Sequence, residues 1–255
     1  KENIALKTYA TQQPKREKAL GAWKYLYKIY EEDELFSHNS LLHNSIGKEI
    51  SRLTDESKAF VESLPEDSYV RCFVPVRQVL ASVARVAQYH PEDIPATRQA
   101  LRDINYADQR LYKSGLLGQA LENHIWFIEN TSGSLDQVFQ DLNQSIDLII
   151  SQIKDDNEKF NLVVSRMIEI LEKRSLYTSS EYLSRKLLDG DDCGCLNTEL
   201  EKQLDKYVKM ATGEIAPDIN FTEFTYRPKG VSAQRLSELE ADYYLVVFAA
   251  SWCSH

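Results

Sequence analysis

Apolar residues recur every three or four positions through most of this chain, the spacing that places side chains on one face of an α-helix. The clearest stripe consists of Leu135, Val138, Leu142, Ile146, Ile149 and Ile153. Similar stripes, separated by polar residues, predict further helices. The predicted helices span residues 15–36, 46–64, 69–89, 96–104, 116–128, 135–153, 160–171, 180–188 and 198–210.

Prolines suggest where some of these helices begin and end. Pro14 directly precedes the first stripe and is well placed for a helix start. Pro65 follows the second stripe and is expected to end that helix. Pro75 lies within the third stripe, where it predicts a kink or a late start.

The polar breaks between the stripes are short, so consecutive helices are expected to fold back on each other as antiparallel pairs. No consensus recurs at a fixed period, so a tetratricopeptide array is not supported. The fold is therefore predicted to be mainly α, with residues 1–210 forming an all-helical domain of irregular antiparallel pairs, arranged as a bundle or a solenoid-like stack.

The pattern changes after residue 210. A turn-like stretch leads into a short Thr- and Phe-rich extended segment around residues 219–224, and a helical turn is expected at residues 236–239. Residues 243–248 then form a continuous apolar run rich in Val and Tyr, which is typical of a strand buried on both faces. Residues 211–255 are therefore predicted to begin a second, α/β domain.

Cys253 follows this apolar run, where the next helix of an α/β unit would begin. The free N–H groups and the dipole of a helix N-terminus stabilise a thiolate, so this position favours redox chemistry. A buried structural cysteine is the alternative interpretation, because free cysteines are among the most buried residues.

Three pieces of the last 45 residues, taken in order, resemble the opening of a thioredoxin-like domain. They are Gly213-x-x-Ala216-Pro217-Asp218, Leu236-Ser237-Glu238-Leu239, and Val246-Val247-Phe248-Ala249-Ala250-Ser251-Trp252-Cys253. The combination is most similar to the TlpA-like thiol-disulfide oxidoreductases of the bacterial cell envelope. The helical region looks like the segment that precedes the thioredoxin domain in envelope proteins of the Bacteroidetes type. A peroxiredoxin would carry Thr where this chain has Ala250.

The resemblance implies a role for each residue around the cysteine. Cys253 would be the attacking thiolate, Trp252 would shield one side of it, and Ser254 and His255 would be the two intervening residues of a Cys-x-x-Cys site. The second cysteine would come next, so the 255 residues are not expected to complete an oxidoreductase cycle. The implied partners are protein thiols or disulfides, the implied location is the periplasm or cell envelope after removal of a signal or lipoprotein segment, and no cofactor is implied.

Composition narrows the class of partner. The net charge of -9 argues against nucleic acid, because no basic stripe is present to displace phosphate counterions. No apolar window approaches the length of a membrane span. Four cysteines are too few for a disulfide framework in 255 residues.

The remaining reactive side chains suggest no metal site. Cys193 and Cys195 are too close in sequence for a mutual disulfide and lack nearby histidines, so an incidental loop is favoured, with pairing elsewhere still open. Cys72 and His124 lie on apolar helix faces and are expected in the core. His38 and His43 flank a polar turn without a ligand pattern.

A second function of a different class stays open. The helices could form a protein-binding or scaffold module whose thioredoxin-like tail is not catalytic. Trp23 and the tyrosines of the first helix are more typical of packing, although aromatic side chains in helical concavities also serve as contact surfaces.

Overall fold

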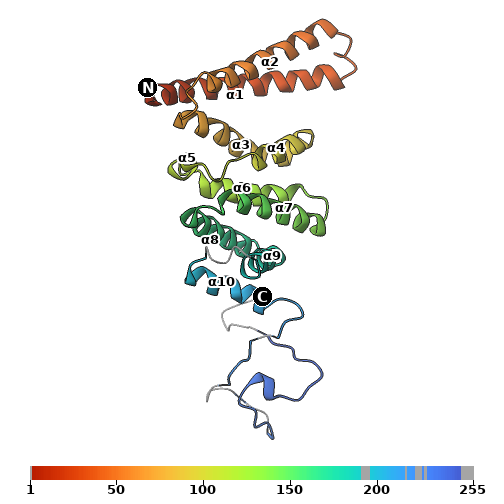
Figure 1. Ribbon diagram of the computed structural model, residues 1–255. Helices are drawn as coiled ribbons and strands as arrows, with labels where there is room; N and C mark the ends of the chain where they lie inside the picture. Colours follow the sequence, from red (N-terminus) through yellow and green to blue (C-terminus); the bar gives the residue numbers. More distant parts are fainter. Residues whose placement is uncertain (1, 191–195, 216, 222–225, 227–228, 248–255) are drawn as a thin grey trace.

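The computed structural model describes residues 2–190, 196–215, 217–221, 226 and 229–247. The helices are α1 (Glu2–Glu32), α2 (Ser40–Glu62), α3 (Tyr69–Tyr89), α4 (Ile94–Arg102), α5 (Gln109–Lys113), α6 (Leu117–Thr131), α7 (Leu135–Ile153), α8 (Asn157–Lys173), α9 (Tyr177–Leu188) and α10 (Thr198–Lys209), with a 3-10 turn η1 (Pro91–Asp93) before α4. They stack along one long axis from the α1–α2 hairpin to the segment after α10 (Figure 1). The predicted mainly α fold is confirmed, in an elongated stack.

The first helix begins earlier than predicted. α1 starts at Glu2 and carries Pro14 in its interior, so the start expected after this proline is wrong. An interior proline removes one helical hydrogen bond and costs about 3 kcal/mol. Tertiary packing outweighs this cost, because Tyr9 is buried against Val70 and Val74 of α3.

The N-terminus of α3 is capped from two sides. Ser68 accepts a hydrogen bond of 3.4 Å from the backbone N–H of Arg71. The carboxylate of Glu2 accepts further hydrogen bonds, each of 3.2 Å, from the backbone N–H groups of Tyr69 and Val70. The helix therefore starts at Tyr69, and the late start considered at Pro75 is wrong.

One large hydrophobic core runs through the stack from α3 to α10. Helix α6 lies at its centre and packs against α3, α4, α7 and α8, while α9 contacts α7, α8 and α10. The largest fully buried side chains include Tyr106, Phe127 and Phe160. The small cluster around Tyr9 is separate from this core. It attaches the α1–α2 hairpin to α3 near the start of α1 and the end of α2.

One helix was missed by the sequence analysis. Helix α5 has only five residues, which is too short to show a helical stripe. Its N-cap Asp108 accepts a hydrogen bond of 2.8 Å from the backbone N–H of Arg110. None of the described helices combines the length and the apolar character that crossing a bilayer requires.

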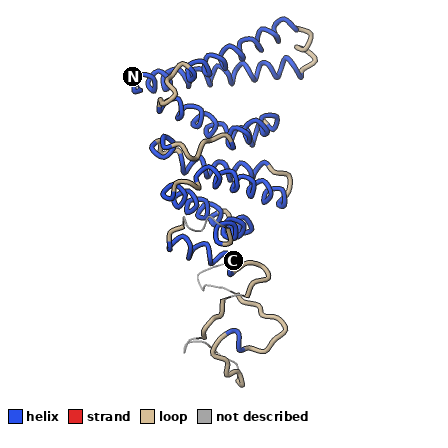
Figure 2. Tube along the Cα trace, in the orientation of Figure 1, coloured by secondary structure: helices blue, strands red, loops and turns tan. Residues whose placement is uncertain are grey.

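The segment after α10 contains little regular structure. The described residues there include one isolated β-bridge, between Asn220 and Arg235, and a 3-10 turn, η3 (Leu236–Glu238), which confirms the predicted helical turn. Figure 2 shows no strand in the described part of the chain.

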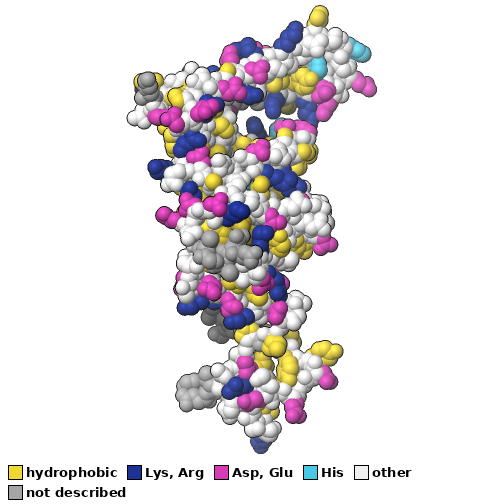
Figure 3. All heavy atoms as spheres, viewed as in Figure 1, with side chains coloured by type: hydrophobic (Ala, Val, Ile, Leu, Met, Phe, Trp, Pro, Cys, Tyr) yellow, Lys and Arg dark blue, Asp and Glu magenta, His cyan; other side chains and the backbone are white. Residues whose placement is uncertain are grey.

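The buried strand predicted over residues 243–248 is wrong for the residues that are described. Tyr243 and Leu245 are 92% and 91% exposed, and residues 243–247 are irregular. No neighbouring strand among the described residues pairs with their backbone groups, so nothing covers the apolar run. Apolar side chains are open to solvent at this end of the molecule (Figure 3).

Candidate functional site

The residues predicted to carry redox chemistry lie outside the described part of the chain. This holds for Trp252, Cys253, Ser254 and His255, and also for Cys193 and Cys195. The structure does describe the segments that lead to Cys253 in sequence.

Two of these segments lie beside each other. The carboxylate of Asp218 accepts hydrogen bonds from the backbone N–H of Ser237 at 2.9 Å and from its hydroxyl at 2.7 Å. These bonds, the side-chain bond first, lower the pKa of Asp218. Two backbone hydrogen bonds of 2.7 and 2.9 Å also join residues 219–221 to residues 234–236. The first two pieces of the thioredoxin-like pattern are therefore in contact.

An irregular stretch leads from η3 to the third piece. The hydroxyl of Tyr244 donates to the carbonyl of Leu239 and accepts from the N–H of Ala241 at 3.2 Å, which holds this stretch against the end of η3. The apolar side chains that follow are open to solvent, with Leu245 91% exposed and Val246 43% exposed.

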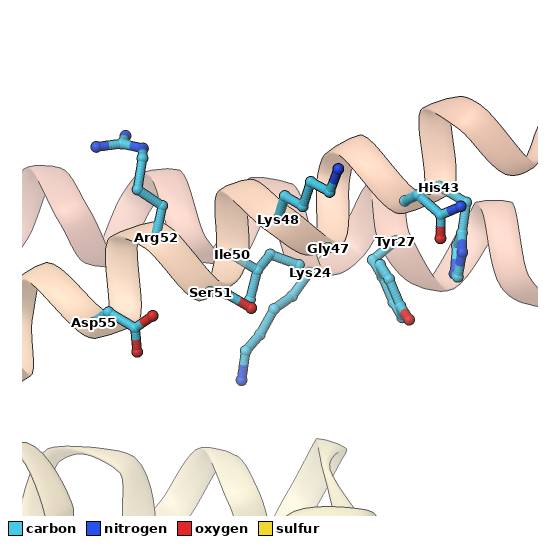
Figure 4. Close-up of a pocket in the computed structure, with 10 residues that line it drawn as sticks. Lys24, Tyr27, His43, Gly47, Lys48, Ile50, Ser51, Arg52 and Asp55 are labelled. Carbon is cyan, nitrogen blue, oxygen red and sulfur yellow. The ribbon is translucent and has the colours of Figure 1, made fainter.

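A cleft of about 910 Å³ lies along the α1–α2 hairpin, on the side that faces the next layer of the stack (Figure 4). The hollow is also visible in the space-filling view (Figure 3). The ammonium group of Lys24 lies 3.9 Å from the carboxylate of Asp93 in η1, so this weak ion pair reaches from the hairpin to the facing layer. The lining residues are Lys24, Tyr27, His43, Asn44, Gly47, Lys48, Ile50, Ser51, Arg52 and Asp55.

Aromatic packing shapes one end of the cleft. The rings of Tyr27 and His43 lie 4.2 Å apart between their centroids. A Cβ atom added to Gly47 would lie 3.3 Å from the Tyr27 ring, so glycine lets this ring approach α2 closely. His43, for which the sequence showed no metal pattern, therefore packs against Tyr27.

The cleft has no strong charge preference. Arg52, which lines the cleft, is paired along α2 with Glu49 at 2.6 Å and Glu56 at 2.5 Å, so its charge is already balanced within the helix (Figure 4). The lining also contains Lys24 and Asp55, whose charges are opposite. Clustered cations, which a phosphate group needs, are therefore not presented here.

One group of side chains in the described residues has the spacing of a cation site. The ligand atoms of His90, Glu92 and Asp93 lie within 4.8 Å of one another. His90 and Glu92 hydrogen bond to each other at 3.1 Å, and the ammonium of Lys24 is already close to Asp93. These contacts account for the cluster without a metal.

His124 and Cys72 were both expected to lie in the core. His124 is buried and hydrogen bonded, as expected of a core histidine. Cys72 is half-buried on α3, less enclosed than predicted. Burial, followed by the charge of Asp108, raises the pKa of the Cys72 thiol, so this cysteine is poorly suited to act as a thiolate.

The cleft was not predicted from the sequence. The only signal for it was the set of aromatic residues at positions 23, 27 and 30, which was interpreted mainly as packing. Comparison with protein families, with curated proteins and with solved structures finds no match to this chain. The thioredoxin-like resemblance therefore rests on the residues themselves.

Proposed function

We propose that this chain belongs to a thiol-disulfide oxidoreductase of the thioredoxin-like class that acts in the bacterial cell envelope, with Cys253 as its nucleophile. The observation that carries the proposal is the pair Trp252-Cys253 placed directly after the apolar run of residues 243–248. Such a position stabilises a thiolate when a helix begins at the cysteine.

The described part of the tail supports this proposal. Residues 219–221 contact residues 234–236 by backbone hydrogen bonds, and η3 precedes the apolar run of residues 243–248, in the order expected of an α/β unit. The apolar side chains of Tyr243, Leu245 and Val247 are exposed, and the rest of such a domain would cover them.

In this proposal Cys253 attacks a disulfide of a partner protein. Its thiolate forms a bond to one sulfur, and the other sulfur leaves as a thiolate, so a mixed disulfide results. Trp252 covers one side of the reacting sulfur, and Ser254 and His255 tune its pKa and reduction potential. The helical stack contributes recognition of the partner.

The cleft along the hairpin favours a second candidate, a helical protein-binding module whose tail does no chemistry. Its aromatic end, formed by Tyr27 and His43, and its mixed polar lining resemble a contact surface more than a reaction centre. The two candidates differ in the reactivity they require of Cys253.

Reaction with oxidised glutathione separates these candidates. We expect Cys253 to form a mixed disulfide with glutathione well before Cys72 at neutral pH, because burial and Asp108 keep the Cys72 thiol protonated. Peptide mapping by mass spectrometry at increasing times measures the modification at each cysteine.

The matched controls are Cys253→Ser, which should abolish the early modification, and Cys72→Ser, which should leave it unchanged. If Cys253 is modified no faster than Cys72, the redox proposal is wrong and the binding module is favoured.

A further inference from the structure

His124 is a titratable side chain enclosed at the centre of the stack. It is 1% exposed on α6, with its Nδ1 atom 3.3 Å from the hydroxyl of Tyr106 and its Nε2 atom 3.1 Å from the hydroxyl of Ser145. In the neutral ring one nitrogen donates and the other accepts. Protonation turns the accepting nitrogen into a donor, so one of the two hydroxyl groups loses its acceptor.

The surroundings of His124 also oppose a positive charge. The charged groups that act on the ring are Arg102 and Arg98 of α4. The nearby carboxylate of Asp141 on α7 is bound to Arg98 at 2.6 Å. Helices α3 and α8 also pack against α6, and among the described residues neither contributes a charge that acts on His124. A protonated ring in this place would be buried without a counter-ion.

Tyr106 connects His124 to residues 103–116, a segment whose helix, α5, has only five residues. This tyrosine is fully buried, although it belongs to the loop between α4 and the five-residue helix α5. Its backbone N–H donates to Gln152 at 2.7 Å, and its carbonyl accepts from Tyr112 at 2.8 Å. A helix as short as α5 is marginal by itself, so tertiary contacts of this kind hold residues 103–116 in place.

We propose that His124 is an acid-sensitive latch, whose protonation releases residues 103–116 from α6 and α7 while the flanking helices stay folded. Tyr106 lies against the His124 ring and belongs to no helix, so opening this segment exposes the ring. Its second attachment consists of the hydrogen bonds of 2.7 and 3.1 Å that the Arg110 guanidinium donates to the backbone carbonyls of Glu66 and Ser68, and neither partner titrates in mild acid.

The direction and size of the effect follow from linkage. Burial, and after it the charges of Arg102 and Arg98, lowers the pKa of His124 from 6.5 to about 4. The opened segment leaves the ring with its ordinary pKa, so the open form binds the proton more tightly. Opening therefore becomes more favourable as pH falls below about 6.5, and the opening equilibrium shifts roughly 100-fold between pH 7 and pH 4.

Hydrogen exchange followed by mass spectrometry tests the latch, with rates corrected for the intrinsic effect of pH. Between pH 7 and pH 4 we expect protection of residues 103–116 to fall by up to roughly 100-fold, the shift that linkage allows over this range. Peptides from the α1–α2 hairpin should keep their protection, because no contact joins the hairpin to His124. Uniform loss of protection across all helices, or constant protection of residues 103–116, would overturn the proposal.

The variant His124→Gln supplies the matched control. Glutamine keeps one donor and one acceptor but does not titrate in this range, so protection of residues 103–116 should no longer depend on pH. If this variant fails to fold, NMR titration of the His124 ring in the unmodified chain decides the question. A ring pKa near 6.5 in the folded protein would contradict the latch.

Discussion

Replacing Asp141 with alanine is expected to lower the free energy of unfolding by about 3 kcal/mol, because it leaves the partly buried guanidinium of Arg98 without its counter-ion. Asp141 is 5% exposed on α7 and accepts a hydrogen bond of 2.6 Å from Arg98 on α4. Ser132 and Gln137 donate to the same carboxylate at 2.8 and 2.9 Å. The substitution therefore removes the acceptor of a network that joins α4 to α7.

The pKa of Asp141 reflects two opposing effects, burial of the carboxylate and the hydrogen bonds that it accepts. Burial alone would raise it, but the hydrogen bonds from Gln137, Ser132 and Arg98 outweigh burial and lower it below its ordinary value of 3.8. The carboxylate thus contributes stability above that value, and this contribution is lost as pH falls through the lowered pKa. Urea unfolding of Asp141→Ala at neutral pH measures the loss.

Two controls isolate the buried pair. Asp136→Ala removes an exposed carboxylate from the first turn of the same helix and is expected to cost at most about 1 kcal/mol. The double variant with Arg98→Met and Asp141→Leu should be less destabilised than Asp141→Ala, because no buried charge is left unpaired. A loss no larger for Asp141→Ala than for Asp136→Ala would contradict this account of the network.

Replacing Phe127 with alanine is expected to cost about 4 kcal/mol, since the change removes a large buried ring and leaves a cavity. Phe127 is fully buried on α6, the helix that packs against α3, α4, α7 and α8. Neighbouring helices hold the walls of this site, so collapse around the smaller side chain is limited. Denaturant unfolding followed by circular dichroism measures the effect.

An exposed apolar residue provides the comparison for Phe127. Leu135 is 65% exposed at the start of α7, and Leu135→Ala should change the stability by less than about 1 kcal/mol. Phe127→Leu keeps much of the buried volume and should fall between the two. Equal effects of Phe127→Ala and Leu135→Ala would show that the core does not centre on α6.

The existence of most helices could be predicted because each stripe is a local pattern. Helices α3 and α7 have the predicted bounds, and Ser68 and Ser134 cap them. The start of α1 could not be predicted, because Pro14 gives a local signal for a helix start, whereas the helix continues through it to Glu2 and Tyr9 packs on α3. Contacts between residues far apart in sequence decide such cases.

The candidate sites also depend on contacts between residues far apart in sequence, which a local pattern does not predict. The cleft depends on how the hairpin lies relative to η1, which no stripe encodes, and the predicted strand at residues 243–248 needs neighbours that its own sequence does not supply. Burial of His124 could be predicted from its apolar helix face. Its place beneath Tyr106 depends on the loop between α4 and α5.

The pKa of the Cys253 thiol tests the central claim of a redox site most directly. A variant with Cys72, Cys193 and Cys195 replaced by serine leaves Cys253 as the only thiol, and its alkylation rate by iodoacetamide is measured against pH. We predict that the midpoint of the rate profile lies at least about one unit below 8.5, the ordinary value for a cysteine. A midpoint at or above about 8.5 would contradict the account, because the thiol would then not be activated for disulfide exchange.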